Sequence, residues 1–201
     1  MNRSAYSQND DISFLLNDVR SCRFCAEMLP VEPRPVVQFH PEARILIAGQ
    51  APGRKVHETG LPFNDASGER LRSWLGISRE VFYDERRIAI VPMGFCYPGT
   101  GNSGDLPPRP ECAPLWREAL LSQLKQLRLS LVIGQYAQAY HFQNNTNTLT
   151  ENVTNWRETW PYMVPLPHPS PRNNRWLKNN PWFEETLLPE LRHQVARVLS
   201  D

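Results

Sequence analysis

The sequence predicts an α/β fold in which a mostly parallel, four-stranded sheet lies between two layers of helices. Four short apolar runs are typical of buried strands, at residues 44–49, 88–91, 129–134 and 162–166. Stretches with helical spacing of apolar residues separate these runs. Such an alternation favours parallel strands with helices on both faces, which gives a three-layer α/β/α architecture.

Helical spacing also predicts where the connecting helices lie. Asp10 or Asp11 is expected to cap the first helix, which delivers Cys22 and Cys25 at its carboxyl end. Residues 144–151 are polar and rich in Asn and Thr, which predicts a surface loop. The other expected helices span residues 67–75, 113–127, 135–142 and 182–199.

Composition limits the kind of protein this can be. At 201 residues with 40% hydrophobic content, the chain is expected to form a single domain over residues 1–201, with a core from about 12 to 199. The 22 basic and 21 acidic residues give a net charge of +1, which excludes a polycation that coats nucleic acid. We see no export signal and no long apolar run, so we expect a cytoplasmic protein without a membrane partner.

The four cysteines have a spacing that indicates a metal site. Cys22 and Cys25 form a Cys-x-x-Cys pair, and Cys96 and Cys112 follow far along the chain. Without an export signal disulfides are not expected, so four thiolates suit either structural zinc or an iron–sulfur cluster. Buried thiols that pack as small hydrophobic groups are the alternative.

Two loops should line the crevice of the predicted sheet, because loops at the carboxyl ends of parallel strands meet there. Residues 49–53 follow the first strand and offer backbone N–H groups and the amide of Gln50. Residues 168–173 follow the last strand and place the imidazole of His168 beside the hydroxyl of Ser170. Such groups can orient a water molecule and stabilise a developing anion.

Taken together, these motifs resemble the uracil-DNA glycosylase superfamily. The resemblance rests on residues 49–53, 60–63 and 168–171, which occur in the family's order, and it extends from Cys22 to about Phe183. The cysteine spacing resembles the iron–sulfur branch, families four and five. The resemblance implies a DNA-repair enzyme: a monofunctional glycosylase that hydrolyses the N-glycosidic bond of uracil or another deaminated base in DNA, the first step of base-excision repair.

The resemblance also implies roles for individual residues. His168 would donate toward the base as negative charge develops, and Phe63 would stack on the flipped base. The implied cofactor is a structural [4Fe-4S] cluster on the four cysteines, which we favour over zinc. The remaining contacts to the base or its neighbouring phosphate would come from Ala51, Gly53 and Ser170. The resemblance also implies that the protein acts as a monomer.

Two positions depart from the family-four pattern. Gln50 stands where that family usually has glutamate, and an amide can orient water but cannot act as a base. Asp65 is the nearest carboxylate that could orient the water instead, although it could equally cap the helix that follows. Pro92 replaces the asparagine that reads uracil, so hypoxanthine, xanthine or ethenocytosine are also candidate substrates.

Basic residues after His168 form the expected DNA-facing edge. Arg172 stands where family one has a wedging leucine, and Arg175 and Lys178 follow it. A solvated helix surface is the alternative for these three residues. Trp176 and Trp182 are expected to pack into the core. The segment 99–110 could either contact DNA or only connect the two cysteines, and its residues do not decide between these roles. The alternative function is a non-catalytic module of the same fold that binds damaged or single-stranded DNA.

Overall fold

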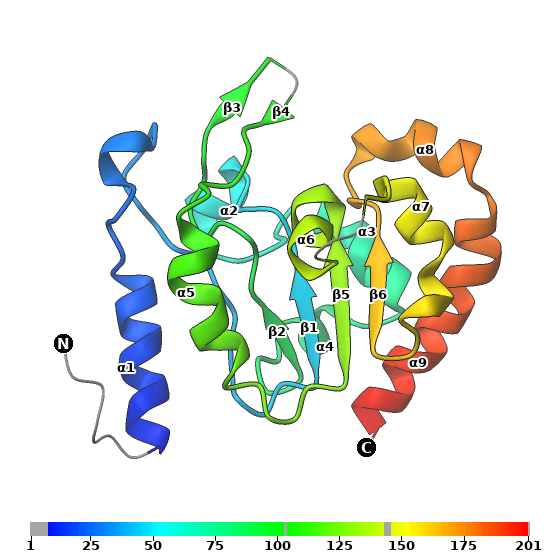
Figure 1. Ribbon diagram of the computed structural model, residues 1–201, viewed down its shortest axis with the longest axis horizontal. Helices are drawn as coiled ribbons and strands as arrows, with labels where there is room; N and C mark the ends of the chain where they lie inside the picture. Colours follow the sequence, from blue (N-terminus) through cyan, green and yellow to red (C-terminus); the bar gives the residue numbers. More distant parts are fainter. Residues whose placement is uncertain (1–7, 103, 143–145, 201) are drawn as a thin grey trace.

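The computed structural model describes residues 8–102, 104–142 and 146–200, with the side chains described from residue 12 onward, and it confirms the α/β prediction (Figure 1). Its main sheet has four parallel strands in the order β2–β1–β5–β6. Each strand falls within the residues that the sequence indicated. The bounds are Ile45–Ala48 for β1, Ile88–Ile90 for β2, Leu129–Ile133 for β5 and Met163–Leu166 for β6.

Alternating side chains of β1 separate two apolar cores, one on each face of the sheet. Ile45 and Ile47 pack into a core with residues of α3 (Ala66–Leu75) and α9 (Leu188–Ser200). Leu46 points to the other face, where α1 (Gln8–Arg20) and α5 (Cys112–Leu121) cover it. Because strand residues alternate between faces, one apolar run serves both helical layers.

Three expected boundaries are wrong. Helix α1 begins at Gln8, so Asp10 and Asp11 lie inside it and do not cap it. Helix α5 ends at Leu121, six residues early, where the chain enters turns that lead to β5. The expected loop over residues 144–151 falls partly outside the described residues, and from Leu149 it is helical, because Thr148 and Glu151 form a capping box.

Helix α6 and the last helical stretch of the chain lie where the sequence predicts them. In the last stretch, a π-helical turn at Phe183–Leu187 leads directly into α9. Trp176 and Trp182 pack against the core, as predicted, with ring centroids 6.1 Å apart. The other bounds are Arg54–Thr59 for α2, Arg79–Phe82 for α4, Thr100–Gly101 for β3, Gly104–Asp105 for β4, Gly134–His141 for α6, Leu149–Thr154 for α7 and Asn174–Asn179 for α8.

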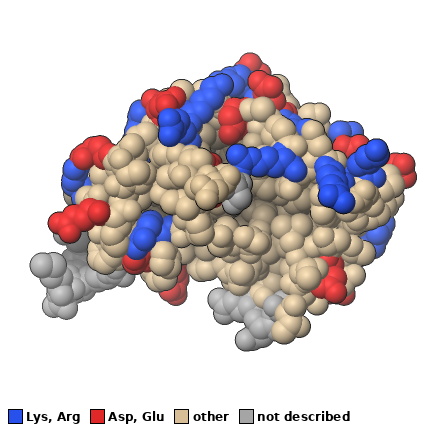
Figure 2. All heavy atoms as spheres, turned by 90° about the horizontal axis from the view of Figure 1, so that it is seen from above, with Lys and Arg blue, Asp and Glu red and all other residues tan. Residues whose placement is uncertain are grey.

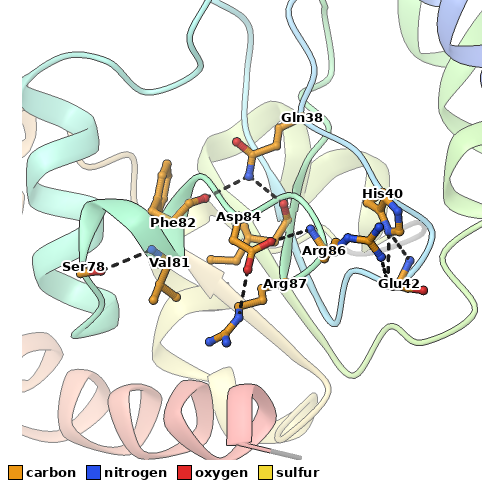
Figure 3. Close-up of polar contacts among 10 residues, drawn as sticks. Gln38, His40, Glu42, Ser78, Val81, Phe82, Asp84, Arg86 and Arg87 are labelled. Atoms are coloured by element: carbon orange, nitrogen blue, oxygen red, sulfur yellow. Dashed lines mark hydrogen bonds and ion pairs between the residues drawn. The ribbon is translucent and has the colours of Figure 1, made fainter.

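An extended segment covers the exposed edge of β2. Gln38 forms an antiparallel bridge with Ile90, and its buried side-chain amide donates to the carbonyl oxygens of Phe82 at 3.0 Å and Ile88 at 2.7 Å (Figure 3). Nearby, Arg86 pairs with Glu42 at 2.6 Å. Covering an edge strand in this way satisfies its backbone and prevents pairing with another chain.

Among the described residues, no helix is long and apolar enough to cross a membrane. The β3–β4 hairpin and α8 both rise above the carboxyl ends of the strands (Figure 1). The residues expected to be functional therefore lie at one end of the sheet, between these two elements and the loops that follow β1 and β6.

Candidate active site

A cavity of about 570 Å³ lies at the carboxyl ends of the strands. The structure brings eight of the predicted site residues together in its lining, from three separate segments of the chain. Helix α8 carries Arg175 and Lys178, which are exposed and lie outside this lining. Basic and acidic side chains are mixed on this face of the molecule (Figure 2). The eight lining residues are Gln50, Ala51, Gly53, Phe63, Asp65, His168, Ser170 and Arg172.

His168 is held in a defined orientation at the end of β6. Its Nδ1 accepts a hydrogen bond from the backbone N–H of Ser170 at 3.2 Å, and its carbonyl oxygen accepts one from the side chain of Asn173 at 2.7 Å. Burial lowers the pKa of His168, while the carboxylates of Asp65 and Asp105 oppose that shift. The neutral ring is therefore favoured, and because Nδ1 accepts, its proton resides on Nε2.

Phe63 has the only positive φ among the described non-glycine residues, at 52°. Its ring lies against Gly49, where a Cβ would be 3.4 Å from the ring, and it meets Phe82 edge-on at a centroid distance of 6.1 Å. A left-handed backbone at a bulky residue costs about 1–3 kcal/mol and is found mostly at functional sites. Phe63, the residue with this backbone conformation, lines the cavity.

Gln50 and Asp65 each have part of their hydrogen-bonding capacity committed. The amide nitrogen of Gln50 donates to the carbonyl oxygen of Leu106 at 3.2 Å. Asp65 caps α3, since its Oδ1 accepts from the backbone N–H of Gly68 at 2.9 Å. The capping alternative for Asp65 is therefore confirmed, although the same side chain also lines the cavity.

Ser170 and Arg172 shape the rim of the cavity. Ser170 caps a short 3-10 helix, Pro171–Asn173, and its carbonyl oxygen accepts from Arg70 at 3.1 Å. The guanidinium of Arg172 lies against Gly104 of β4, so closely that a Cβ on that glycine would be 1.7 Å from Nη1. The loop that carries His168 thus contacts the β3–β4 hairpin directly.

Sequence reasoning missed Asp105, a carboxylate that lines the cavity from β4. Thr100 donates to its Oδ1 at 3.3 Å, and a Cβ on Gly53 would lie 3.1 Å from its Oδ2. The residue belongs to the stretch 99–110, rich in Gly and Pro, for which the sequence offered no decision. No local pattern marks it, because only the tertiary packing of the hairpin brings it to the cavity. Gln135, which follows β5, and Asn173, in the loop after β6, also line the cavity and were not singled out.

Buried Arg117 supports the floor of the cavity. Its Nη1 donates to the carbonyl oxygens of Val91 and, at 2.9 Å, of Pro92, and Pro92 itself lines the cavity. Its Nη2 lies 2.9 Å from Nε2 of His141. Burial lowers the pKa of Arg117 to about 10 and, together with the charge of Arg117, lowers the pKa of His141 to about 4.

The four cysteines line a second pocket, formed by the segment after α1 and the ends of the loop that carries the hairpin. None of them is in a disulfide. Burial raises the pKa of the thiol of Cys96 to about 11 and that of Cys112 to about 12. Two sulfurs accept hydrogen bonds of 3.3 Å, Cys22 from the indole of Trp116 and Cys112 from a backbone N–H. Within the described ranges, no three His, Cys, Asp or Glu side chains are grouped so that they could hold a metal ion.

Comparison with known proteins places these features in a family. The model of the uracil DNA glycosylase superfamily matches residues 36–192 of this chain. A solution NMR structure of a candidate uracil DNA glycosylase from Methanosarcina acetivorans is similar at 20% sequence identity, with a TM-score of 0.45. That match covers 80% of this chain and 97% of the other.

Proposed function

The chain belongs to the uracil DNA glycosylase superfamily, and on this premise we propose that it hydrolyses the N-glycosidic bond of a deaminated base in DNA. The observation that carries this proposal is the geometry of His168, a neutral imidazole that accepts at Nδ1, so that its proton is on Nε2, and that lines the same cavity as Phe63. The proposed enzyme is monofunctional. It would release the base and leave an abasic site.

The proposed reaction begins when the damaged nucleotide is flipped out of the helix. Unstacking costs a few kcal/mol, and the ring of Phe63 offers a surface on which the extruded base can stack. As the bond between the sugar C1′ and the base breaks, its electron pair moves to the base. Donation from His168 then stabilises the negative charge on the base carbonyl. A water molecule adds to C1′ and gives up a proton.

The cavity supports a substrate range wider than uracil. Pro92 lines it where family four has a uracil-reading asparagine, and a proline side chain offers no hydrogen bond to a pyrimidine edge. A pocket selects uracil through hydrogen bonds only if it has a polar group that pairs with the uracil edge. A wrong base is then rejected because it leaves that buried polar group unpaired. Hypoxanthine, xanthine and ethenocytosine are accordingly proposed beside uracil.

We also propose that Cys22, Cys25, Cys96 and Cys112 hold a [4Fe-4S] cluster, whose role is structural. All four thiols line one pocket. Hydrogen bonds to two of the sulfurs suit thiolate ligands, whose charge such donors stabilise. A single zinc ion on the same four thiolates is the alternative.

The test is an excision assay on oligonucleotides that carry uracil, hypoxanthine, xanthine or ethenocytosine. We expect abasic-site formation with at least one lesion. In His168→Ala the rate should fall by about 100-fold or more, because a donor aimed at developing charge is worth that much. His193→Ala is the matched control, since His193 lies on α9 outside the cavity and should leave the rate unchanged. No product from any lesion, with DNA binding retained, would establish the non-catalytic binding module instead.

A further inference from the structure

The β3–β4 hairpin places a carboxylate in the cavity that no family motif contains. Asp105 lies on β4, between Cys96 and Cys112, and lines the cavity together with His168 and Phe63. A protein that binds the polyanion DNA loses affinity by exposing a negative charge at the binding site. A carboxylate at this position therefore needs a reason other than DNA affinity.

The carboxylate of Asp105 is exposed and has a neighbour at each of its two oxygens. The hydroxyl of Thr100 donates to Oδ1 at 3.3 Å, and the hydroxyl of buried Tyr97 is hydrogen-bonded to that of Thr100. Oδ2 lies over the first cavity loop, 3.1 Å from the place where a Cβ on Gly53 would sit. One oxygen is thus anchored by a chain of hydroxyl groups, while the other is held beside the backbone that borders the substrate.

The other candidates for orienting the water are less suited to accept a proton. Gln50 is an amide, so it has no basic form in the working pH range. Asp65 has one oxygen engaged as the cap of α3, and its loss would disturb the helix. Asp105 caps no helix, and its side chain lines the same cavity as His168.

We propose that Asp105 orients the water that attacks C1′ and accepts its proton. This inference rests on the proposed glycosylase function and deepens it. The base leaves with the electron pair of the glycosidic bond, while the water oxygen bonds to C1′ and its proton passes to Oδ2 of Asp105. The carboxylate then returns that proton to solvent. His168 and Asp105 thereby divide the work, one acting on the leaving base and the other on the nucleophile.

The experiment compares Asp105→Asn with wild type on the lesion that wild type cleaves, under single-turnover conditions. We expect the rate to fall by about 100-fold or more, as for loss of a general base. Affinity for an oligonucleotide with an uncleavable abasic analogue should stay equal or become tighter, because a negative charge has been removed. The melting temperature should not change. Glu184→Gln removes an exposed carboxylate outside the cavity and should affect neither rate nor binding.

A second variant tests whether the position of the Asp105 carboxylate matters while its charge is kept. Gly53→Ala keeps the carboxylate but places a methyl group against Oδ2, and the φ of −77° at Gly53 accommodates alanine. Its rate should fall by about tenfold or more without loss of DNA binding. A rate for Asp105→Asn within about threefold of wild type would overturn the inference and leave the glycosylase function intact. Weaker DNA binding or a lower melting temperature in that variant would also overturn it, and an inactive wild type would refute both proposals.

Discussion

The carbonyl oxygen of Phe63 occupies the space that a side chain on Gly68 would need. A Cβ on Gly68 would lie 1.7 Å from that oxygen and 2.8 Å from the Cβ of Phe63. The glycine is the third residue of α3, and its N–H is bound by the cap residue Asp65. The positive φ of Phe63 and the absence of a side chain at Gly68 therefore belong to one local arrangement that presents the aromatic ring to the cavity.

Gly68→Ala should reduce both stability and excision. In an ordinary helix this change stabilises by about 1 kcal/mol, but here the new methyl group must displace the backbone of Phe63. We expect a net loss of about 2 kcal/mol or more, measured by denaturant unfolding, and weaker excision. Ser73→Ala, at an exposed position of the same helix, should be neutral in both assays. Stabilisation by Gly68→Ala would refute the close approach.

The basic residues of α8 should contribute to DNA affinity without affecting chemistry. We expect the double variant of Arg175→Ala and Lys178→Ala to bind DNA more weakly. The slope of log affinity against log salt should become shallower by up to about 2, because two phosphate contacts are lost. Single-turnover excision at saturating protein should be unchanged. Lys125→Ala, at the opposite end of the sheet, is the control. An unchanged salt slope in the double variant would show that these two side chains of α8 face solvent and do not contact DNA.

Stability should fall in mild acid because His141 is buried beside Arg117. The folded protein lowers the pKa of His141 to about 4, so between that value and the ordinary 6.5 the unfolded chain binds more protons. This contribution is fully present above pH 6.5 and is lost as pH falls to about 4, at roughly 3 kcal/mol in total. His168, whose pKa is also lowered, acts in the same direction. His141→Gln should therefore flatten only part of the pH profile of unfolding, and an unchanged profile would contradict the assignment.

Metal content distinguishes the proposed cluster from zinc. The purified protein should contain about four iron atoms per chain and absorb near 400 nm. Cys112→Ser should lower the iron content and the melting temperature together, because binding of such a centre is coupled to folding. Trp116→Phe removes the hydrogen bond to the sulfur of Cys22 but keeps all four ligands, so it should retain iron. One zinc per colourless chain would refute the cluster.

Much of the fold was predictable because its strands are continuous apolar runs. Leu129–Ile133 is buried at every position, and Ser130 is its one polar residue. Short elements were harder to predict. Helix α7 depends on the capping box of Thr148 and Glu151, a four-residue signal inside a polar stretch that otherwise reads as loop. The end of α5 is set by turns after Leu121, although the apolar pattern continues to Leu127.

The site was predictable where residues belong to loops that leave parallel strands, as for His168 and Gln50. Residues from elsewhere could not be found in this way. Asp105 reaches the cavity because a hairpin folds back over the sheet, and Arg117 supports it from inside α5. Both depend on contacts between residues far apart in the chain, which no local pattern records.

Cys96 and Cys112 enclose the segment that carries Gly104 and Asp105 into the cavity. If these cysteines hold the proposed cluster, a newly synthesised chain without iron would lack the ligand bonds that hold both ends of that segment in place. The protein would then become active when the cluster is inserted and not when the chain is synthesised. A cell short of iron, or one under oxidants that dismantle such clusters, would lose this activity while the polypeptide remained present.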